Sequence, residues 1–224
     1  IVYYGPSNQP AIKIIGAKNG IYQGLQVKVA DGISGVDVIS IGTWQQANST
    51  AGLTFIGCNL EVNDGVNNKG FVLGKLENNT NGNDVSQITF ISCAVWGRQT
   101  QASFPAANGQ VGYYNAGNNT LQITWVGGGF TFIDRGVFIE KAGSVYFYGM
   151  GTSHVNTIFD LTWANLFTIN GGRFEFGQTF IKVNSGGMPI VTVQGAPQTE
   201  DFKPSNGRFI EFNAAGHLIL DGLK

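Results

Sequence analysis

Two acidic residues occupy matching places in a repeated pattern and could perform hydrolytic chemistry. The segments "VFIEK" (137–141) and "TIFDL" (157–161) each place a carboxylate after apolar residues, at Glu140 and Asp160. If neighbouring strands stack these groups about 5 Å apart, they match the acid and nucleophile of a retaining glycosidase. Repulsion would then raise the pKa of one group and make it a proton donor. The alternative is a solvated rim or inter-chain salt bridges, which Lys182 at the same place in the next copy favours.

Aromatic residues offer a second kind of chemistry, because sugars bind to aromatic faces and to amide and hydroxyl groups. The candidate glycan-binding residues are Trp96, Trp44, Tyr113 and Tyr114, with Trp163 and Tyr146 as further outward candidates. Trp96 is the first choice, because it follows a predicted turn at an outward place and precedes a long polar loop. The alternative is that Trp96 packs beneath that loop or against another chain.

The sequence offers no pattern for a metal or a cofactor. His154 and His217 are 63 residues apart and have no Cys or His neighbour at ligand spacing. Cys58 and Cys93 occupy the same place in adjacent repeats, which fits either a disulfide or two stacked reduced thiols. We expect neither metal nor cofactor, and both states of the cysteines stay open.

The composition limits the fold and the partners. The 224 residues are 42% hydrophobic and 12% charged, enough to build one substantial core, and 33 glycines indicate frequent turns. The formal net charge of −1 provides no electrostatic surface for nucleic acid. No apolar run approaches the roughly 18 residues that cross a bilayer, so we expect no membrane insertion. The chain opens on Ile1 without Met or a basic segment, so we expect a processed chain or a segment of a longer one.

A short phrase repeats along the chain and supplies the elements that would position these residues. Its copies are "IKIIGA" (12–17), "LTFIGC" (53–58), "ITFISC" (88–93), "ITWVGG" (123–128), "VYFYGM" (145–150), "FTINGG" (167–172), "VTVQGA" (191–196) and "LILDGL" (218–223). Alternation with a period of two predicts strands whose first and third residues face a core. The fifth residue is glycine in every copy except one, which has Ser92, and this predicts a corner. Repeating units of about 20–50 residues are typical of solenoids.

Two further strands repeat in phase with the first. "NLEV" (59–62), "AVWG" (94–97), "GFTF" (129–132) and "RFEF" (173–176) follow the corner, and "VFIEK", "TIFDL", "TFIKV" (179–183) and "RFIEF" (208–212) come later. The pattern predicts an all-β fold, a right-handed parallel β-helix of about eight coils with three strands per coil. It forms a single domain over residues 1–224, less regular over 1–50 and regular over 51–224.

The repeats resemble a known family of folds. The stack over about residues 50–224, above all "FTINGGRFEFGQTFIKV" (167–183), is similar to the pectate-lyase-like β-helices of bacteriophage tail spikes and related tail proteins. The resemblance implies a homotrimeric virion protein that contacts host cell-surface glycan and other virion tail proteins. It assigns no catalytic residue by motif. The calcium-dependent lyase chemistry of such folds is not expected, because acids such as Asp64, Asp84 and Asp134 are isolated.

The third strand provides a separate argument for assembly. If Ile139 and its counterparts face the core, alternation turns four large apolar side chains outward at about 4.8 Å per coil. These predicted interface residues are Phe138, Ile158, Phe180 and Phe209. A contiguous apolar patch usually meets a partner, and the alternative is that a loop of the same chain covers it.

Three function classes follow from these patterns. The first is a structural and receptor-binding tail-spike or tail-fibre component of the virion, acting as a homotrimer. The second is a tail-spike depolymerase that hydrolyses a host polysaccharide at Glu140 and Asp160, or at a site between chains. The third is a secreted, monomeric carbohydrate-active enzyme, extracellular rather than virion-bound. We favour the first, because no convincing catalytic cluster accompanies the repeats.

Overall fold

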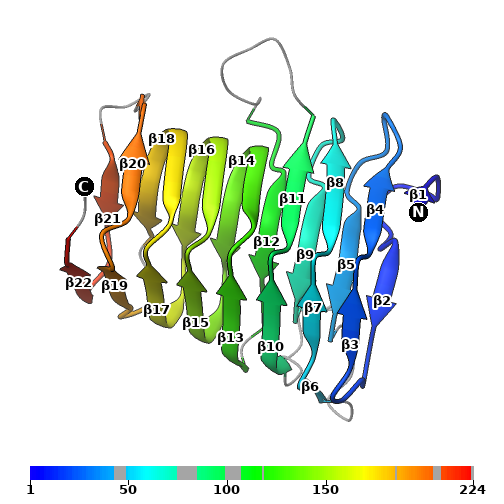
Figure 1. Cartoon of the computed structure of the whole chain (residues 1–224), viewed down its shortest axis with the longest axis horizontal. Helices are drawn as coiled ribbons and strands as arrows, with labels where there is room; N and C mark the ends of the chain where they lie inside the picture. Colours follow the sequence, from blue (N-terminus) through cyan, green and yellow to red (C-terminus); the bar gives the residue numbers. More distant parts are fainter. Residues whose placement is uncertain are drawn as a thin grey trace.

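The described chain is built from parallel strands. The computed structural model describes residues 1–42, 49–74, 85–98, 107–117, 119–184, 186–203 and 208–222, and these contain strands and no helix. The strands follow one another side by side along the long axis of the molecule, from β1 near one end to β22 near the other (Figure 1). They form two sheets in which neighbouring strands run parallel. The prediction of an all-β, parallel fold is therefore confirmed.

The first sheet contains thirteen strands. Its path runs through β1 (Val2–Tyr3), β4 (Gln26–Val29), β8 (Asn59–Asn63), β11 (Ala94–Gly97), β14 (Gly129–Ile139), β12 (Val111–Asn115), β9 (Lys69–Leu73), β5 (Asp37–Ile41) and β2 (Ile12–Ile14). From β14 the sheet continues through β16 (Gly151–Leu161) and β18 (Arg173–Val183) to β20 (Gln198–Glu200) and β21 (Ile210–Phe212).

The second sheet contains nine strands. Its path runs through β22 (His217–Leu220), β19 (Ile190–Gln194), β17 (Ala164–Asn170), β15 (Ala142–Tyr148), β13 (Thr120–Val126), β10 (Val85–Ile91), β7 (Thr54–Ile56) and β3 (Ile21–Gln23), and β6 (Thr50–Ala51) pairs with β10. Every strand of this path except β3 comes from a copy of the repeated phrase.

The second and third predicted strands of each repeat belong to the same sheet. In the C-terminal half they are continuous, as the eleven-residue strands β14, β16 and β18. In the N-terminal half inserted residues separate them into β8 and β9, and into β11 and β12. Strand β14 joins the two halves, because its first part pairs with β11 and its second part with β12.

The core lies between the two sheets. Along the second sheet from β7 to β19, the predicted inward residues are at most 1% exposed: Leu53, Phe55, Ile88, Phe90, Ile123, Trp125, Val145, Phe147, Phe167, Ile169, Val191 and Val193. Their rings stack from strand to strand, with centroids 5.3 Å apart for Phe55 and Phe90 and 4.7 Å for Phe90 and Trp125. Rings of the first sheet meet them edge-on, as Phe71 does against Phe90 at 4.8 Å. The predicted core columns are confirmed from β7 to β19, but not in β22, where Leu218 is half-buried and Leu220 is 45% exposed.

The corner after each of these strands needs a left-handed residue. Gly149 has a φ of 60°, and Ser92, the exception in the repeat, has a φ of 51°. Glycine adopts this conformation without a steric cost, whereas a residue with a Cβ does not. The predicted corner is therefore confirmed, and Ser92 is strained there.

One copy of the phrase does not lie in the sheet that its pattern predicts. Residues 12–17 do not stack on the copy at 53–58, because β2 pairs with β5 and places Ile12 beside Ile39. Strand β3 takes the expected place beside β7, with Tyr22 next to Phe55. An apolar strand followed by a glycine is not unique to the second sheet. Strand β5 of the first sheet, the partner of β2, is also apolar and is followed by a glycine with positive φ.

The predicted outward ladder of the third strand is wrong. Ile158 and Phe180 are completely buried in the core. Phe209 is half-buried and stacks on Phe180 with ring centroids 5.2 Å apart. Only Phe138, which is also half-buried, lies on the outer face, where it stacks on Tyr114 at 5.3 Å.

The register explains this error. Strands β14 and β16 pair Val137 with Phe159 and Phe138 with Asp160, so Phe138 and Ile158 are not in one column. Within β16, the consecutive residues Ile158 and Phe159 are both fully buried, so the strand does not alternate there. An inference from strict alternation therefore places Ile158 on the wrong side.

Candidate functional site

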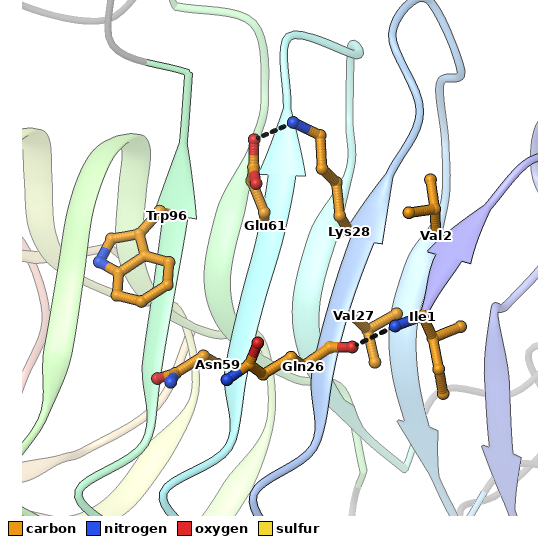
Figure 2. Close-up of a pocket in the computed structure, with 8 residues that line it drawn as sticks. All are labelled: Ile1, Val2, Gln26, Val27, Lys28, Asn59, Glu61 and Trp96. Atoms are coloured by element: carbon orange, nitrogen blue, oxygen red, sulfur yellow. Dashed lines mark hydrogen bonds and ion pairs between the residues drawn. The ribbon is translucent and has the colours of Figure 1, made fainter.

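A groove of about 440 Å³ lies on the outer face of the first sheet near its N-terminal end (Figure 2). Its lining residues are Ile1, Val2, Gln26, Val27, Lys28, Asn59, Glu61 and Trp96. They come from β1, β4, β8 and β11, four strands that are neighbours in the sheet. The groove therefore crosses several repeats rather than one loop.

The parallel register arranges the polar side chains of the groove in two rows. One row pairs Gln26 with Asn59, and the next places Glu61 between Lys28 and Trp96 (Figure 2). Between the rows, Leu60 and the equivalent residues of the adjacent strands are buried in the core. This alternation fixes the outward direction of the groove residues.

Trp96 lies in this groove, as the sequence predicted for an outward aromatic residue. Its side chain is 41% exposed. The pairing of β11 with β8 places Trp96 next to Glu61. The preceding residue, Val95, is completely buried, so the Trp96 side chain points outward. Trp96 thus presents a large apolar ring beside charged and amide groups.

An exposed ion pair lines the groove. Lys28 Nζ lies 2.9 Å from Glu61 Oε1, and both side chains are accessible to solvent. The hydrogen bond that Lys28 donates to the Glu61 carboxylate raises the pKa of Lys28 above its ordinary value. The ammonium is therefore charged at neutral pH, and the pair can exchange its mutual contact for hydroxyl groups of a ligand.

The aromatic ring, the two amides of Gln26 and Asn59, and the ion pair can together bind a sugar. An indole face packs on the C–H face of a pyranose, and the amides and charged groups hydrogen-bond its hydroxyls. Hydrolysis would require two carboxyl groups on opposite sides of the bond. The described lining of the groove contains a single carboxylate, Glu61, which is engaged by Lys28.

The other predicted glycan-binding residues lie elsewhere. Tyr113 is completely buried, so its predicted outward position is wrong; burial raises the pKa of its hydroxyl. Tyr114 is half-buried on the outer face, and its hydroxyl donates a hydrogen bond to the Glu140 carboxylate. Trp44 lies outside the described residues.

The predicted catalytic pair is not brought together by the register. Asp160 pairs with Phe138 on one side and Lys182 on the other, while Glu140 lies two residues beyond Phe138. Asp160 is 8% exposed and lies 3.4 Å from Arg135 Nη1. The expectation of two stacked carboxylates is wrong. The repeated pattern places Glu140 beside Asp160, but the observed pairing of β14 with β16 differs from that alignment by two residues.

The Asp160 carboxylate belongs to an ion-pair network instead. Asn184 Nδ2 donates to its Oδ1 at 2.7 Å, and the Arg135 guanidinium, which contacts its Oδ2, also lies 4.2 Å above the Phe138 ring. A buried carboxylate is stable when it is paired and hydrogen-bonded in this way. The network is typical of a structural role.

Cys58 and Cys93 are reduced and completely buried. Each thiol lies 3.4 Å from a carbonyl oxygen of the preceding repeat, that of Tyr22 for Cys58 and that of Phe55 for Cys93. The neighbouring Cys58 thiol and burial raise the pKa of Cys93. Of the two alternatives, the structure therefore contains stacked thiols.

The described residues contain no group of three His, Cys, Asp or Glu side chains that could hold a metal ion. Within the same part of the chain, no helix has the length and apolar character needed to cross a membrane.

Comparisons with protein-family models, curated proteins and solved structures find no match for this chain. Function must therefore be inferred from the sites themselves.

Proposed function

We propose that this protein binds a polysaccharide on the outer face of a solenoid and serves as a structural and receptor-binding component of a phage tail spike or tail fibre. The observation that carries the binding part is the Trp96 groove. There an exposed indole lies beside an accessible ion pair and in the same groove as two amides, Gln26 and Asn59. The virion location and the contact with other tail proteins depend on the family resemblance.

In this proposal the two sheets form a right-handed parallel β-helix of about eight coils with three strands per coil, of which the second and third are the two parts of one long strand in β14, β16 and β18. The in-register stacking of the repeats supports it, since successive copies of the phrase pair residue by residue from Leu53 to Leu220. Parallel crossover connections are almost always right-handed. A rigid rod of this kind would present the groove at a fixed place to a host cell-surface glycan.

The proposed ligand lies across the strands. Since adjacent strands are about 4.8 Å apart, a hexose unit covers about one strand spacing, and the groove from β1 to β11 can accept a short run of sugars. One sugar would stack on Trp96, and its neighbours would contact the Lys28–Glu61 pair and the amides. Many weak polar contacts and one ring contact are typical of carbohydrate sites.

A homotrimer is part of the proposal, and its support is the family resemblance. The apolar ladder no longer supports it, because Ile158 and Phe180 are buried within one chain and offer no surface to a partner. The depolymerase alternative has lost its candidate pair, since Asp160 is engaged by Arg135 and Asn184. No specific observation favours a monomeric secreted enzyme. We therefore propose binding rather than hydrolysis.

The test is Trp96→Ala in a binding assay against a panel of purified bacterial surface polysaccharides. We expect the variant to bind the recognised polysaccharide at least about tenfold more weakly, because the stacking surface is lost. Trp96→Phe should retain part of the affinity. Leu121→Ala removes a similarly exposed apolar side chain, 44% exposed, from the other sheet and should bind like the wild type. Equal binding by Trp96→Ala and the wild type would refute the site.

A further inference from the structure

A second exposed tryptophan lies at the turn between β16 and β17, away from the first groove. Trp163 is 51% exposed, and two adjoining hollows share it and Asn165. The larger hollow, about 590 Å³, is also lined by Gly186, Gly187, Met188, Asn213, Ala214 and Ala215. The smaller, about 270 Å³, is completed by Lys141 and Ala142.

Contacts with neighbouring strands fix the position of Trp163 in the stack. Ala142 N donates to the Trp163 carbonyl at 2.9 Å, and Ala164 pairs with Ala142, so Lys141 and Trp163 occupy equivalent places in neighbouring strands. On the other side the ring packs on Gly187, where an added Cβ would lie 3.2 Å from Trp163 Cδ1. The indole is thus seated against the backbone of the next repeat and still exposes half of its surface.

The charge of these hollows differs from that of the Trp96 groove. Lys141 is the single ionisable side chain among the described lining residues. No ion pair joins it to another residue in the part of the chain that the structure describes. The adjacent carboxylate of Glu140 accepts the Tyr114 hydroxyl, and that of Asp160 is engaged by Arg135. A ligand in these hollows therefore meets an indole, amides and one cation.

We infer that the Trp163 hollows bind a hexuronate residue of an acidic polysaccharide. The indole stacks on the C–H face of the pyranose, Lys141 pairs with the sugar carboxylate, and Asn165 hydrogen-bonds its hydroxyls. The Trp96 groove, which contains both signs of charge, has no such preference. This inference rests on the proposed binding of polysaccharide and deepens it by adding a second site and the acidic class of glycan.

The experiment is a ¹⁹F NMR titration of protein labelled with 5-fluorotryptophan. The resonances of Trp96 and Trp163 are assigned by replacing each residue with Phe, so the two sites report separately. The ligands are short oligosaccharides of galacturonate and of glucuronate, together with their carboxyl-reduced, neutral counterparts. We expect the acidic oligosaccharides to shift the Trp163 resonance, and Lys141→Gln to weaken that binding about fivefold, as for an exposed ion pair. Lys141→Arg, the matched control, should bind like the wild type.

The outcomes separate the two proposals. A shift of the Trp96 resonance alone overturns the second site and leaves the proposed function intact. Equal shifts of Trp163 by acidic and neutral ligands, unaffected by Lys141→Gln, overturn the acidic class. A Trp163 resonance that changes with protein concentration in the absence of sugar identifies a contact between copies and overturns the glycan site. No shift at either tryptophan with the uronates, while a panel polysaccharide shifts Trp96, also overturns this inference alone.

Discussion

Tyr114 shows how one residue of the outer face is committed to structure. Its ring stacks on Phe138, and its hydroxyl donates to the Glu140 carboxylate. Burial, and then the neighbouring Glu140 charge, raise the pKa of the hydroxyl well above the ordinary value of 10.0. The folded state therefore holds the Tyr114 proton more tightly than the unfolded chain does.

Tyr114→Phe should make the protein less sensitive to alkali. Below about pH 10 the hydroxyl is neutral in both states, and its contribution to stability is fully present. Above that pH only the unfolded chain ionises, so each such tyrosine lowers the free energy of unfolding by about 1.4 kcal/mol per pH unit. Urea unfolding at a series of alkaline pH values should give a slope smaller by about this amount in the variant.

The control for this prediction lies in the neutral range. From about pH 7 to 9 neither state of Tyr114 ionises, so wild type and Tyr114→Phe should show parallel pH dependence there, offset by the lost hydrogen bond. Identical slopes above pH 10 would contradict the raised pKa. Tyr113, whose pKa burial also raises, should preserve part of the alkaline slope in the variant.

The outward position of Trp96 could be predicted from the sequence, and that of Tyr113 could not. Trp96 follows Val95, whose place in a repeated apolar column sets the direction of its neighbour. Tyr113 and Tyr114 are consecutive, so one of them must face inward, but no repeated column indicated which. Trp163 was one of several outward aromatic candidates; its two hollows depend on residues far along the chain, which sequence spacing does not bring together.

The corners of the second sheet tie each strand to the next. At Gly149, with a φ of 60°, an added Cβ would meet no atom within 4 Å. At the neighbouring corner, Gly128 has a φ of 65°, and a Cβ would lie 1.9 Å from the Cys93 carbonyl oxygen. The first glycine is needed for its conformation alone, and the second also for the close approach of two repeats.

Alanine at these two corners should therefore have different costs. Gly149→Ala should destabilise by about 1–2 kcal/mol, the cost of a left-handed alanine, and lower Tm by about 2–8 °C. Gly128→Ala adds a clash with a hydrogen-bonded carbonyl and should cost more than about 4 kcal/mol. Thermal unfolding by circular dichroism measures both. If the two variants unfolded at the same temperature, the close packing of Gly128 on Cys93 would be wrong.

The strands of the second sheet could be predicted, and those of the first only in part. In the second sheet strict alternation ends at a glycine, so the apolar residues and the corner both mark the register. In the first sheet, Phe132, His154 and Phe176 adopt positive φ in the middle of long strands and stack on one another with ring centroids 4.6 Å apart. Neither these positive-φ residues nor the double burial of Ile158 and Phe159 has a signature in a single sequence, because bulky residues rarely adopt such a φ.

At the scale of the whole molecule, the stack derives its stability from a continuous apolar interior. Rings follow one another from Tyr22 and Phe55 through Trp125 to Phe147, so each repeat buries its neighbours' side chains. Stability in such an assembly is approximately a sum over repeats and their interfaces. A charge placed inside one repeat should therefore disrupt the stack rather than detach a partner.

Phe180→Asp distinguishes burial in the core from burial between chains. Phe180 is completely buried and packs edge-on against Phe159 and Phe174 of its own chain. An unpaired carboxylate there should cost at least about 4 kcal/mol, since the aromatic contacts are lost and the charge is desolvated. We expect the variant to lose its β-sheet circular dichroism signal, whereas Leu121→Asp on the exposed face should stay folded.

Light scattering on the same proteins tests the proposed assembly. The wild type should have a mass near three times 23.9 kDa if the trimer forms. Leu121→Asp should preserve that mass, unless the outer face of the second sheet is the interface, in which case it should dissociate into folded monomers. A folded Phe180→Asp protein of lower mass than the wild type would contradict the burial of Phe180 within one chain and restore the apolar ladder as an interface. An unfolded Phe180→Asp protein beside a trimeric wild type would place the interface on other residues.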